Sequence, residues 1–164
     1  MTTTEHHAFT RNDLPAHTRE TIVTLLNQHL ADTFDLYSQV KQAHWNVKGM
    51  HFIQLHLLFD QIADPLLEYT DSIAERITSL GGKAMGTARM AAAKSQLEEF
   101  PAEFVDGKQV LEVLSQRYAV YSSTSREAIG ATDELGDPVT ADLFTEISRT
   151  IDKHLWMLEA HLQD

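Results

Sequence analysis

The sequence predicts an all-α protein with four long helices in one bundle. Four segments of about 25–30 residues carry apolar residues at steps of three and four, which is the period of an amphipathic helix. No segment shows the short alternating β-branched runs that are typical of strands. Two of the three links between the segments are short, whereas the middle link is about 20 residues long. A chain of 164 residues is predicted to form one domain.

The first two helices are expected over residues 16–46 and 52–80. Gly49 follows the first segment and the Gly81–Gly82 pair follows the second, and glycine is a common terminator of helices. Pro65 lies inside the second segment. Because proline lacks a backbone donor, it should kink this helix or be absorbed by a local bulge.

The connector over residues 83–105 contains "TARMAAAKSQ", which could add a short helix. Asp106 is a good N-cap for the third helix over residues 106–134. Asp137 is a good N-cap for the fourth, because Pro138 suits the first helical position. Four helices with one long crossover that carries a short extra helix form a ferritin-like four-helix bundle, predicted over residues 16–164 after a flexible tail over residues 1–15.

Composition limits the cellular setting. The chain has no cysteine, so disulfides and thiolate metal sites are excluded. The first fifteen residues lack the apolar core of a signal peptide, and no run is long and apolar enough to cross a membrane. We therefore expect a cytoplasmic protein, with association with the nucleoid left open. The net charge of −11 should repel phosphate backbones and attract metal cations.

Acidic side chains and a histidine share one face of the second helix. His56 and Asp60 are four residues apart, as are Asp71 and Glu75. Eleven residues from Asp60 to Asp71 are close to three full turns, so both pairs lie on nearly the same stripe. Such groups are costly to bury unless they are paired or bind a metal ion. Each of them taken alone is more often a structural or solvated residue.

One copy of the chain cannot bring these groups around one metal ion. Asp60 and Asp71 are about 16 Å apart along the helix. His44, at the end of the first helix, can meet His56 because the two helices are antiparallel neighbours. A mixed shell of histidine and carboxylate suits iron, but His44, His56 and Asp60 leave it incomplete. A two-fold dimer with antiparallel second helices would complete it.

A di-iron centre inside one bundle is not expected. Such a centre needs a Glu-x-x-His motif on each of two helices. The chain has no usable pair, since Glu159 and His161 have the wrong spacing.

The chain resembles the Dps family, the mini-ferritins named as DNA-binding proteins from starved cells. The resemblance covers essentially the whole chain and is clearest in "KQAHWNVKGMHFIQLHLLFD" and "TDSIAERITSLGG". It implies a hollow dodecamer that oxidises Fe(II), preferably with hydrogen peroxide and more slowly with O₂, and stores ferric mineral. The implied ligands of the two-iron intersubunit site are His44, His56 and Asp60 of one subunit with Asp71 and Glu75 of its two-fold mate.

Other residues have expectations of their own. The resemblance places Trp45 beside the iron site, where it is oxidised or relays electrons, although a tryptophan is more often a core residue. It also implies that at least one of Asp137, Asp142 and Glu146 lines a pore for Fe(II). The remaining histidines are expected elsewhere: His51 at the surface, His29 in an interface or the core, and His154 and His161 on a packing face.

DNA condensation, with the bundle as a scaffold, is the alternative function. Residues 1–20 contain two arginines, no lysine and three acidic residues. The histidines of this tail, His6, His7 and His17, gain charge only below about pH 6.5. We therefore expect weak or no DNA binding at neutral pH.

Overall fold

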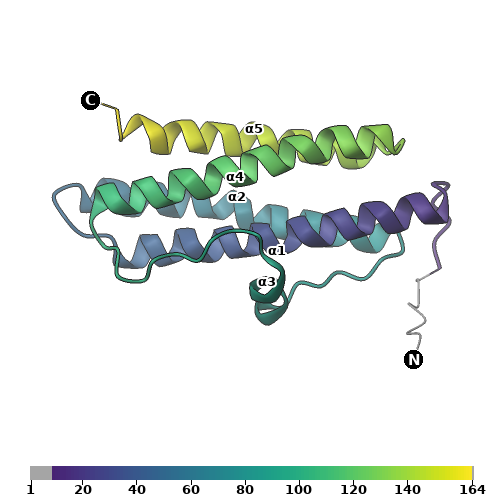
Figure 1. Cartoon of the computed structure of the whole chain (residues 1–164), viewed down its shortest axis with the longest axis horizontal. Helices are drawn as coiled ribbons and strands as arrows, with labels where there is room; N and C mark the ends of the chain where they lie inside the picture. Colours follow the sequence, from purple (N-terminus) through teal and green to yellow (C-terminus); the bar gives the residue numbers. More distant parts are fainter. Residues whose placement is uncertain (1–8, 164) are drawn as a thin grey trace.

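The computed structural model describes residues 9–163 as five α-helices, and no strand occurs among these residues. None of the helices in this part of the chain is both long and apolar enough to cross a bilayer. The prediction of an all-α bundle is confirmed, and the bounds of the first three long helices lie within one residue of those expected. The helices are α1 Ala16–Asn46, α2 Phe52–Ser79, α3 Ala88–Lys94, α4 Gly107–Glu134 and α5 Pro138–Ala160 (Figure 1).

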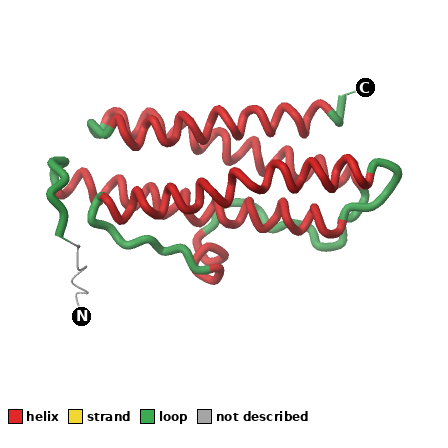
Figure 2. The backbone as a smooth tube through the Cα atoms, turned by 180° about the vertical axis from the view of Figure 1, so that it is seen from behind, coloured by secondary structure: helices red, strands yellow, loops and turns green. Residues whose placement is uncertain are grey.

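Two helical hairpins make the bundle. Helices α1 and α2 pack against each other, as do α4 and α5, and the two pairs contact through α1 with α4 and α2 with α5. The crossover from α2 to α4 runs along the bundle, and α3 lies beside α1 on the outside of the four long helices (Figures 1 and 2). The long connector therefore joins opposite ends of the bundle, as its length predicts.

Side-chain caps define where the helices begin. The Asp106 carboxylate accepts from the backbone N–H groups of Lys108 and Gln109, at 3.1 and 3.4 Å. The Asp137 carboxylate accepts from the N–H of Thr140 at 3.1 Å. Each cap satisfies a donor that has no partner within the helix, which is worth about 1 kcal/mol of helix stability.

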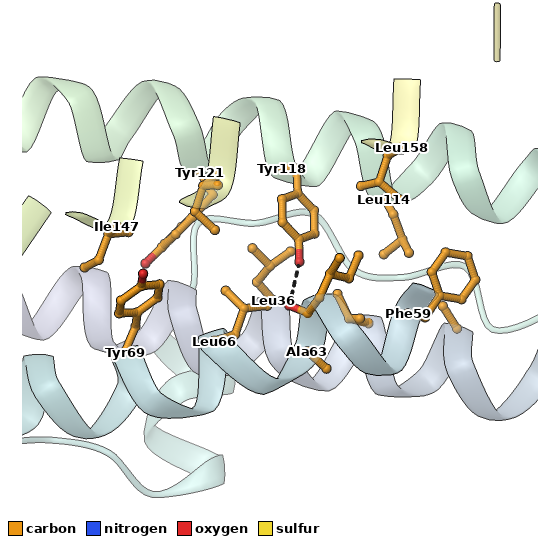
Figure 3. Close-up of a cluster of buried hydrophobic side chains, with 14 of the residues drawn as sticks. Leu36, Phe59, Ala63, Leu66, Tyr69, Leu114, Tyr118, Tyr121, Ile147 and Leu158 are labelled. Atoms are coloured by element: carbon orange, nitrogen blue, oxygen red, sulfur yellow. Dashed lines mark hydrogen bonds between the residues drawn. The ribbon is translucent and has the colours of Figure 1, made fainter. Parts of the chain in front are cut away.

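Helix α2 continues through Pro65 without a break between Phe52 and Ser79. The proline leaves the carbonyl of Gln61 without its usual donor. The buried hydroxyl of Tyr118 on α4 donates to the adjacent carbonyl of Ile62 at 3.2 Å (Figure 3). This contact ties α4 to the turn of α2 that Pro65 weakens.

One apolar core runs along the axis of the bundle. Each long helix contributes side chains that are fully buried, and burying one of them contributes about 1.5–3 kcal/mol. Figure 3 shows part of this core, in which the labelled members are Leu36, Phe59, Ala63, Leu66, Tyr69, Leu114, Tyr118, Tyr121, Ile147 and Leu158.

The tail predicted over residues 1–15 is only partly described, because residues 1–8 lie outside the described residues. Within residues 9–15, Leu14 packs against the core. The Leu14 carbonyl accepts from Nε of Arg19 at 3.1 Å.

Candidate metal centre

His44 and His56 form a reciprocal pair where α1 ends and α2 begins. Nδ1 of His44 donates to the carbonyl oxygen of His56 at 2.7 Å, and Nδ1 of His56 donates to the carbonyl oxygen of His44 at 2.8 Å. The two imidazole rings stack with centroids 3.8 Å apart and planes 20° apart. The short turn between α1 and α2 holds the two helix ends in this register.

These two bonds fix the tautomer of both rings. A carbonyl oxygen can only accept, so both Nδ1 atoms carry hydrogen. In a neutral imidazole, the lone pair then lies on Nε2, which is the atom free to bind a metal ion. Bonds of this kind orient the ligand rings at metal centres. The pair is therefore prepared for metal binding through two Nε2 atoms.

Asp60 lies one turn along α2 from His56 and is held by a lysine. Nζ of Lys41 is 2.6 Å from Oδ1 of Asp60, and Nε2 of His44 is 3.8 Å from the same oxygen. The hydrogen bond from Lys41 is the main cause that lowers the pKa of Asp60 below its ordinary value. The carboxylate is therefore ionised at neutral pH. A metal ion that bound to Asp60 would have to displace the ammonium group of Lys41.

Asp71 and Glu75 lie on the same helix but away from this group. Both side chains are exposed, and neither carboxylate has a hydrogen bond or ion pair within the described part of the chain. Helix geometry separates Asp60 from Asp71 by about 16 Å. The chain thus brings His44, His56 and Asp60 together and leaves Asp71 and Glu75 outside.

The group in one chain is not a complete metal site. Among residues 9–163, no three histidine, aspartate or glutamate side chains gather closely enough to hold a metal ion. The donors present, two imidazoles and exposed carboxylates, are the nitrogen and oxygen ligands typical of iron centres.

Trp45 follows His44 and is exposed to 66%, so it is not a core residue in one chain. Nζ of Lys41 lies 5.9 Å from the centroid of its ring. The same lysine therefore contacts the predicted ligand Asp60 and the neighbouring tryptophan. Lys41 was not predicted from the sequence.

Asp137 has a structural role that the sequence analysis identified only in part. Besides capping α5, its carboxylate accepts two bonds from Nη2 of Arg76 on α2, at 2.9 and 2.8 Å, and the hydroxyl of Thr140 also bonds to it. The side chain is buried. Asp137 is therefore already paired within one chain, whereas Asp142 and Glu146 are exposed.

The other histidines lie where the sequence analysis expected them, with one difference. His51 is exposed. His29 and His154 are buried in the bundle, at 5% and 6% exposure. His161 is exposed rather than packed, and its Nδ1 donates to the carbonyl of Met157 at 2.7 Å.

Comparison with known proteins identifies the family. The family model for the ferritin-like domain matches residues 23–164. The chain is 43% identical over 155 residues to the "DNA protection during starvation protein" of Agrobacterium fabrum, covering 94% of this chain and 96% of that protein.

Solved structures agree with this result. DpsC from Streptomyces coelicolor has a TM-score of 0.92 and 33% identity, and the match covers 100% of this chain and 97% of that one. The Dps protein from Vibrio cholerae, described as a member of the superfamily of ferritin-like diiron-carboxylate proteins, has a TM-score of 0.88 and 26% identity, with 95% and 99% coverage. The chain therefore belongs to the Dps family of ferritin-like proteins.

Proposed function

We propose that the protein is a ferroxidase that oxidises Fe(II), preferably with hydrogen peroxide over O₂, and stores the ferric product as mineral inside a dodecameric cage. The observation that carries the proposal is the reciprocal pair of His44 and His56. It leaves two imidazole lone pairs beside the ionised carboxylate of Asp60. Membership of the Dps family supports the same activity. We place the protein in the cytoplasm, where it would protect the cell from oxidative damage.

The remaining ligands come from a second copy of the chain. Asp60 and Asp71 lie symmetrically about the peptide bond between Pro65 and Leu66, and His56 and Glu75 lie symmetrically about the same point. A two-fold axis through this point, with antiparallel α2 helices, would bring Asp71 and Glu75 of each subunit to the other's histidine group. One axis thus completes two sites at once.

The outer face of α2 supports this pairing. Ile53, Leu57 and Leu67 are exposed to 53%, 59% and 49% on a helix whose inner face is already packed. Large apolar side chains on one exposed helix face are typical of a surface that contacts another protein. A second α2 helix would cover them.

The two-iron arrangement suits peroxide chemistry. Each Fe(II) gives one electron, and one hydrogen peroxide takes both as its O–O bond breaks, so its oxygens leave as hydroxide or water. Delivery of both electrons together limits the release of hydroxyl radical. The carboxylates of Asp60, Asp71 and Glu75 favour the harder Fe(III), whereas His44 and His56 hold Fe(II). Asp142 or Glu146 would line the pore through which Fe(II) reaches the cage interior.

Stoichiometric peroxide oxidation tests the function. Anaerobic protein is loaded with two Fe(II) per site and mixed with one peroxide, and the ferric absorbance in the near ultraviolet is followed. We expect a rapid rise in the wild type and its loss in Asp71→Asn/Glu75→Gln. Glu68→Gln, an exposed acid on the same helix, is the matched control and should behave as the wild type. No rise in the wild type would contradict the proposed activity.

We also propose that Trp45 lies close enough to the iron to exchange electrons with it. Trp156 is exposed to nearly the same extent, 63% against 66%, and serves as the control. Anaerobic Fe(II) at two ions per site should quench the fluorescence of the Trp156→Phe variant, which retains Trp45. The Trp45→Phe variant should be unaffected. Equal quenching in both variants would contradict a position of Trp45 beside the iron.

A further inference from the structure

Five buried polar atoms make no hydrogen bond of ordinary geometry among residues 9–163, although the Tyr121 hydroxyl lies close to one of them, Ser125 Oγ. Unpaired polar atoms in a protein core are rare and costly, so a group of them calls for a partner. Three of the five lie at about the same height along the bundle axis, which we call one level, and they come from three different helices. The five atoms are His29 Nδ1, Gln39 Oε1, Ser125 Oγ, Ser148 Oγ and His154 Nδ1.

The register of α1 and α4 places His29 level with Ser125. Thr33 Oγ1 and the hydroxyl oxygen of Tyr121 are 2.5 Å apart, so these residues mark one level. The two helices run in opposite directions (Figure 1). One turn back from Thr33 on α1 is His29, and one turn forward from Tyr121 on α4 is Ser125.

The register of α4 and α5 adds Ser148 to the same level. The rings of Tyr118 and His154 lie 6.1 Å apart across these antiparallel helices. Ser125 is seven residues after Tyr118, and Ser148 is six residues before His154. Because the helices are antiparallel, the two serines differ in height along the bundle by about the rise of one residue. The ring of His29 also packs on Phe144, one turn before Ser148, at 4.6 Å.

These atoms are enclosed, and their side chains are small. Ser125 is fully buried, and His29 and Ser148 are more than nine-tenths buried. On α4, the neighbours along the core stripe of Ser125 are the large Tyr121 and the small Ala128. Serine and alanine are smaller than the aromatic and branched side chains that line the rest of the core.

From this layer we propose that the bundle core binds one ordered water molecule between His29 Nδ1, Ser125 Oγ and Ser148 Oγ. A buried water needs two to four polar partners, and the layer offers three. An imidazole nitrogen and two hydroxyls together donate and accept, which matches a small neutral molecule that does both.

The chemistry of the layer excludes a cation as the occupant. The one carboxylate nearby on α1, Asp32, is buried but accepts from the backbone N–H of Gln96 at 2.7 Å and from the Gln28 amide at 3.1 Å, on the side of α1 that faces the connector. Burial lowers the pKa of His29 to about 4, so the ring is neutral at neutral pH. A single imidazole with two hydroxyls is a poor site for iron or zinc.

A crystal structure of the wild-type protein, at a resolution that shows ordered water, tests the proposal without any variant. We expect one peak at hydrogen-bond distance from all three atoms in every subunit. Absence of the peak, or rotation of the two serines onto other partners, would overturn the proposal. Anomalous scattering at that position would also overturn it, because it would mean a metal ion.

A pair of variants tests which groups hold the water. Ser125→Ala/Ser148→Ala leaves a single polar partner, so we expect the peak to disappear. Ser115→Ala, a serine on α4 that bonds to the Glu112 carbonyl, is the control and should keep it. A peak at full occupancy in the double variant would contradict the assignment. The outcome is independent of the proposed iron chemistry, since none of these residues belongs to the metal centre.

Discussion

At the scale of the residue, the two histidines of the candidate metal centre are oriented by backbone carbonyls rather than by side chains. Each ring is tied to the other residue's carbonyl, so neither ring can turn without breaking a bond between α1 and α2. Loss of one histidine therefore removes a ligand and also the bond that orients its partner. For this reason the effects of replacing His44 and His56 should not add independently.

If Asp60 binds Fe(II) as proposed, Lys41 would compete with the metal ion for its carboxylate. Its Nζ is 2.6 Å from the carboxylate and carries a charge that repels a metal cation. We expect Lys41→Met to bind Fe(II) a few-fold more tightly, because the partly buried ion pair must be broken first, and even an exposed pair is worth about 0.2–1 kcal/mol. Anaerobic titration calorimetry measures this affinity.

The control for Lys41 is Lys83→Met, which removes the same charge from the exposed connector after α2. It should leave the affinity for Fe(II) unchanged. Weaker Fe(II) binding in Lys41→Met would mean that the lysine holds Asp60 in the geometry that binds metal, contrary to this account.

At the scale of the element, the helices were predictable because their signals are local. Asp106 and Asp137 cap helices within three residues of themselves, and Gly49 ends a turn with a φ of 116° that glycine tolerates. Contacts between helices were not predictable in this way. The bonds from Arg76 to Asp137 and from Tyr118 to Ile62 depend on how helices far apart in sequence are rotated against each other.

In the candidate site too, features fixed by one helix were predictable and contacts between helices were not. Spacing along α2 predicts that Asp60 and Asp71 share a face, since helix geometry fixes it. Lys41 gives no such signal, because a lysine three residues before His44 is ordinary on a solvated helix surface. Its contact with Asp60 follows only from the packing of α1 on α2.

Two buried histidines make the bundle sensitive to acid. Burial lowers the pKa of His29 and of His154 to about 4, and Lys153 adds to the effect at His154. An unfolded histidine has a pKa of about 6.5, so the unfolded chain takes up protons first as the pH falls. The contribution of the two neutral histidines to the free energy of unfolding is fully present above the unfolded pKa. It is lost as the pH falls from about 6.5 to about 4. Acidification from about pH 7.5 to about pH 5 should therefore lower the free energy of unfolding by about 2 kcal/mol for each histidine.

Urea unfolding at fixed protein concentration, repeated across this pH range, measures the loss. The variant His29→Leu/His154→Leu should lose less stability on acidification than the wild type. His161→Leu, which replaces an exposed histidine, should follow the wild type. An unchanged pH dependence in the double variant would show that the buried histidines are not responsible.

At the scale of the whole molecule, charge argues against tight DNA binding at neutral pH. Each chain carries a net charge of −11, and an assembly of such chains would repel a phosphate backbone. Acidification should strengthen binding, because His6, His7 and His17 gain charge and many tails act together. The first two of these histidines lie outside the described residues.

Gel-shift assays at low salt, at about pH 7.5 and about pH 6, test this expectation. We expect no shift at the higher pH and a weak shift at the lower one. The variant His6→Asn/His7→Asn/His17→Asn should lose the weak shift. A tight shift at the higher pH would favour the alternative function, in which the bundle is a scaffold for DNA condensation.

We propose that each iron site is divided between two chains. The described residues of one chain hold no three metal-binding side chains together, and the carboxylates that would complete the group lie on the far half of α2. Chains that lack one half of the site should therefore be rescued by chains that lack the other half.

The most direct measurement uses mixed assemblies of His44→Ala/His56→Ala chains with Asp71→Ala/Glu75→Ala chains. Each variant alone should be inactive in the stoichiometric peroxide assay. A mixed dimer should contain one intact site and one site that keeps only Asp60, so it should recover up to about half of the wild-type signal. Native mass spectrometry confirms that the chains have mixed. No recovery in confirmed mixed dimers would contradict a site shared between subunits.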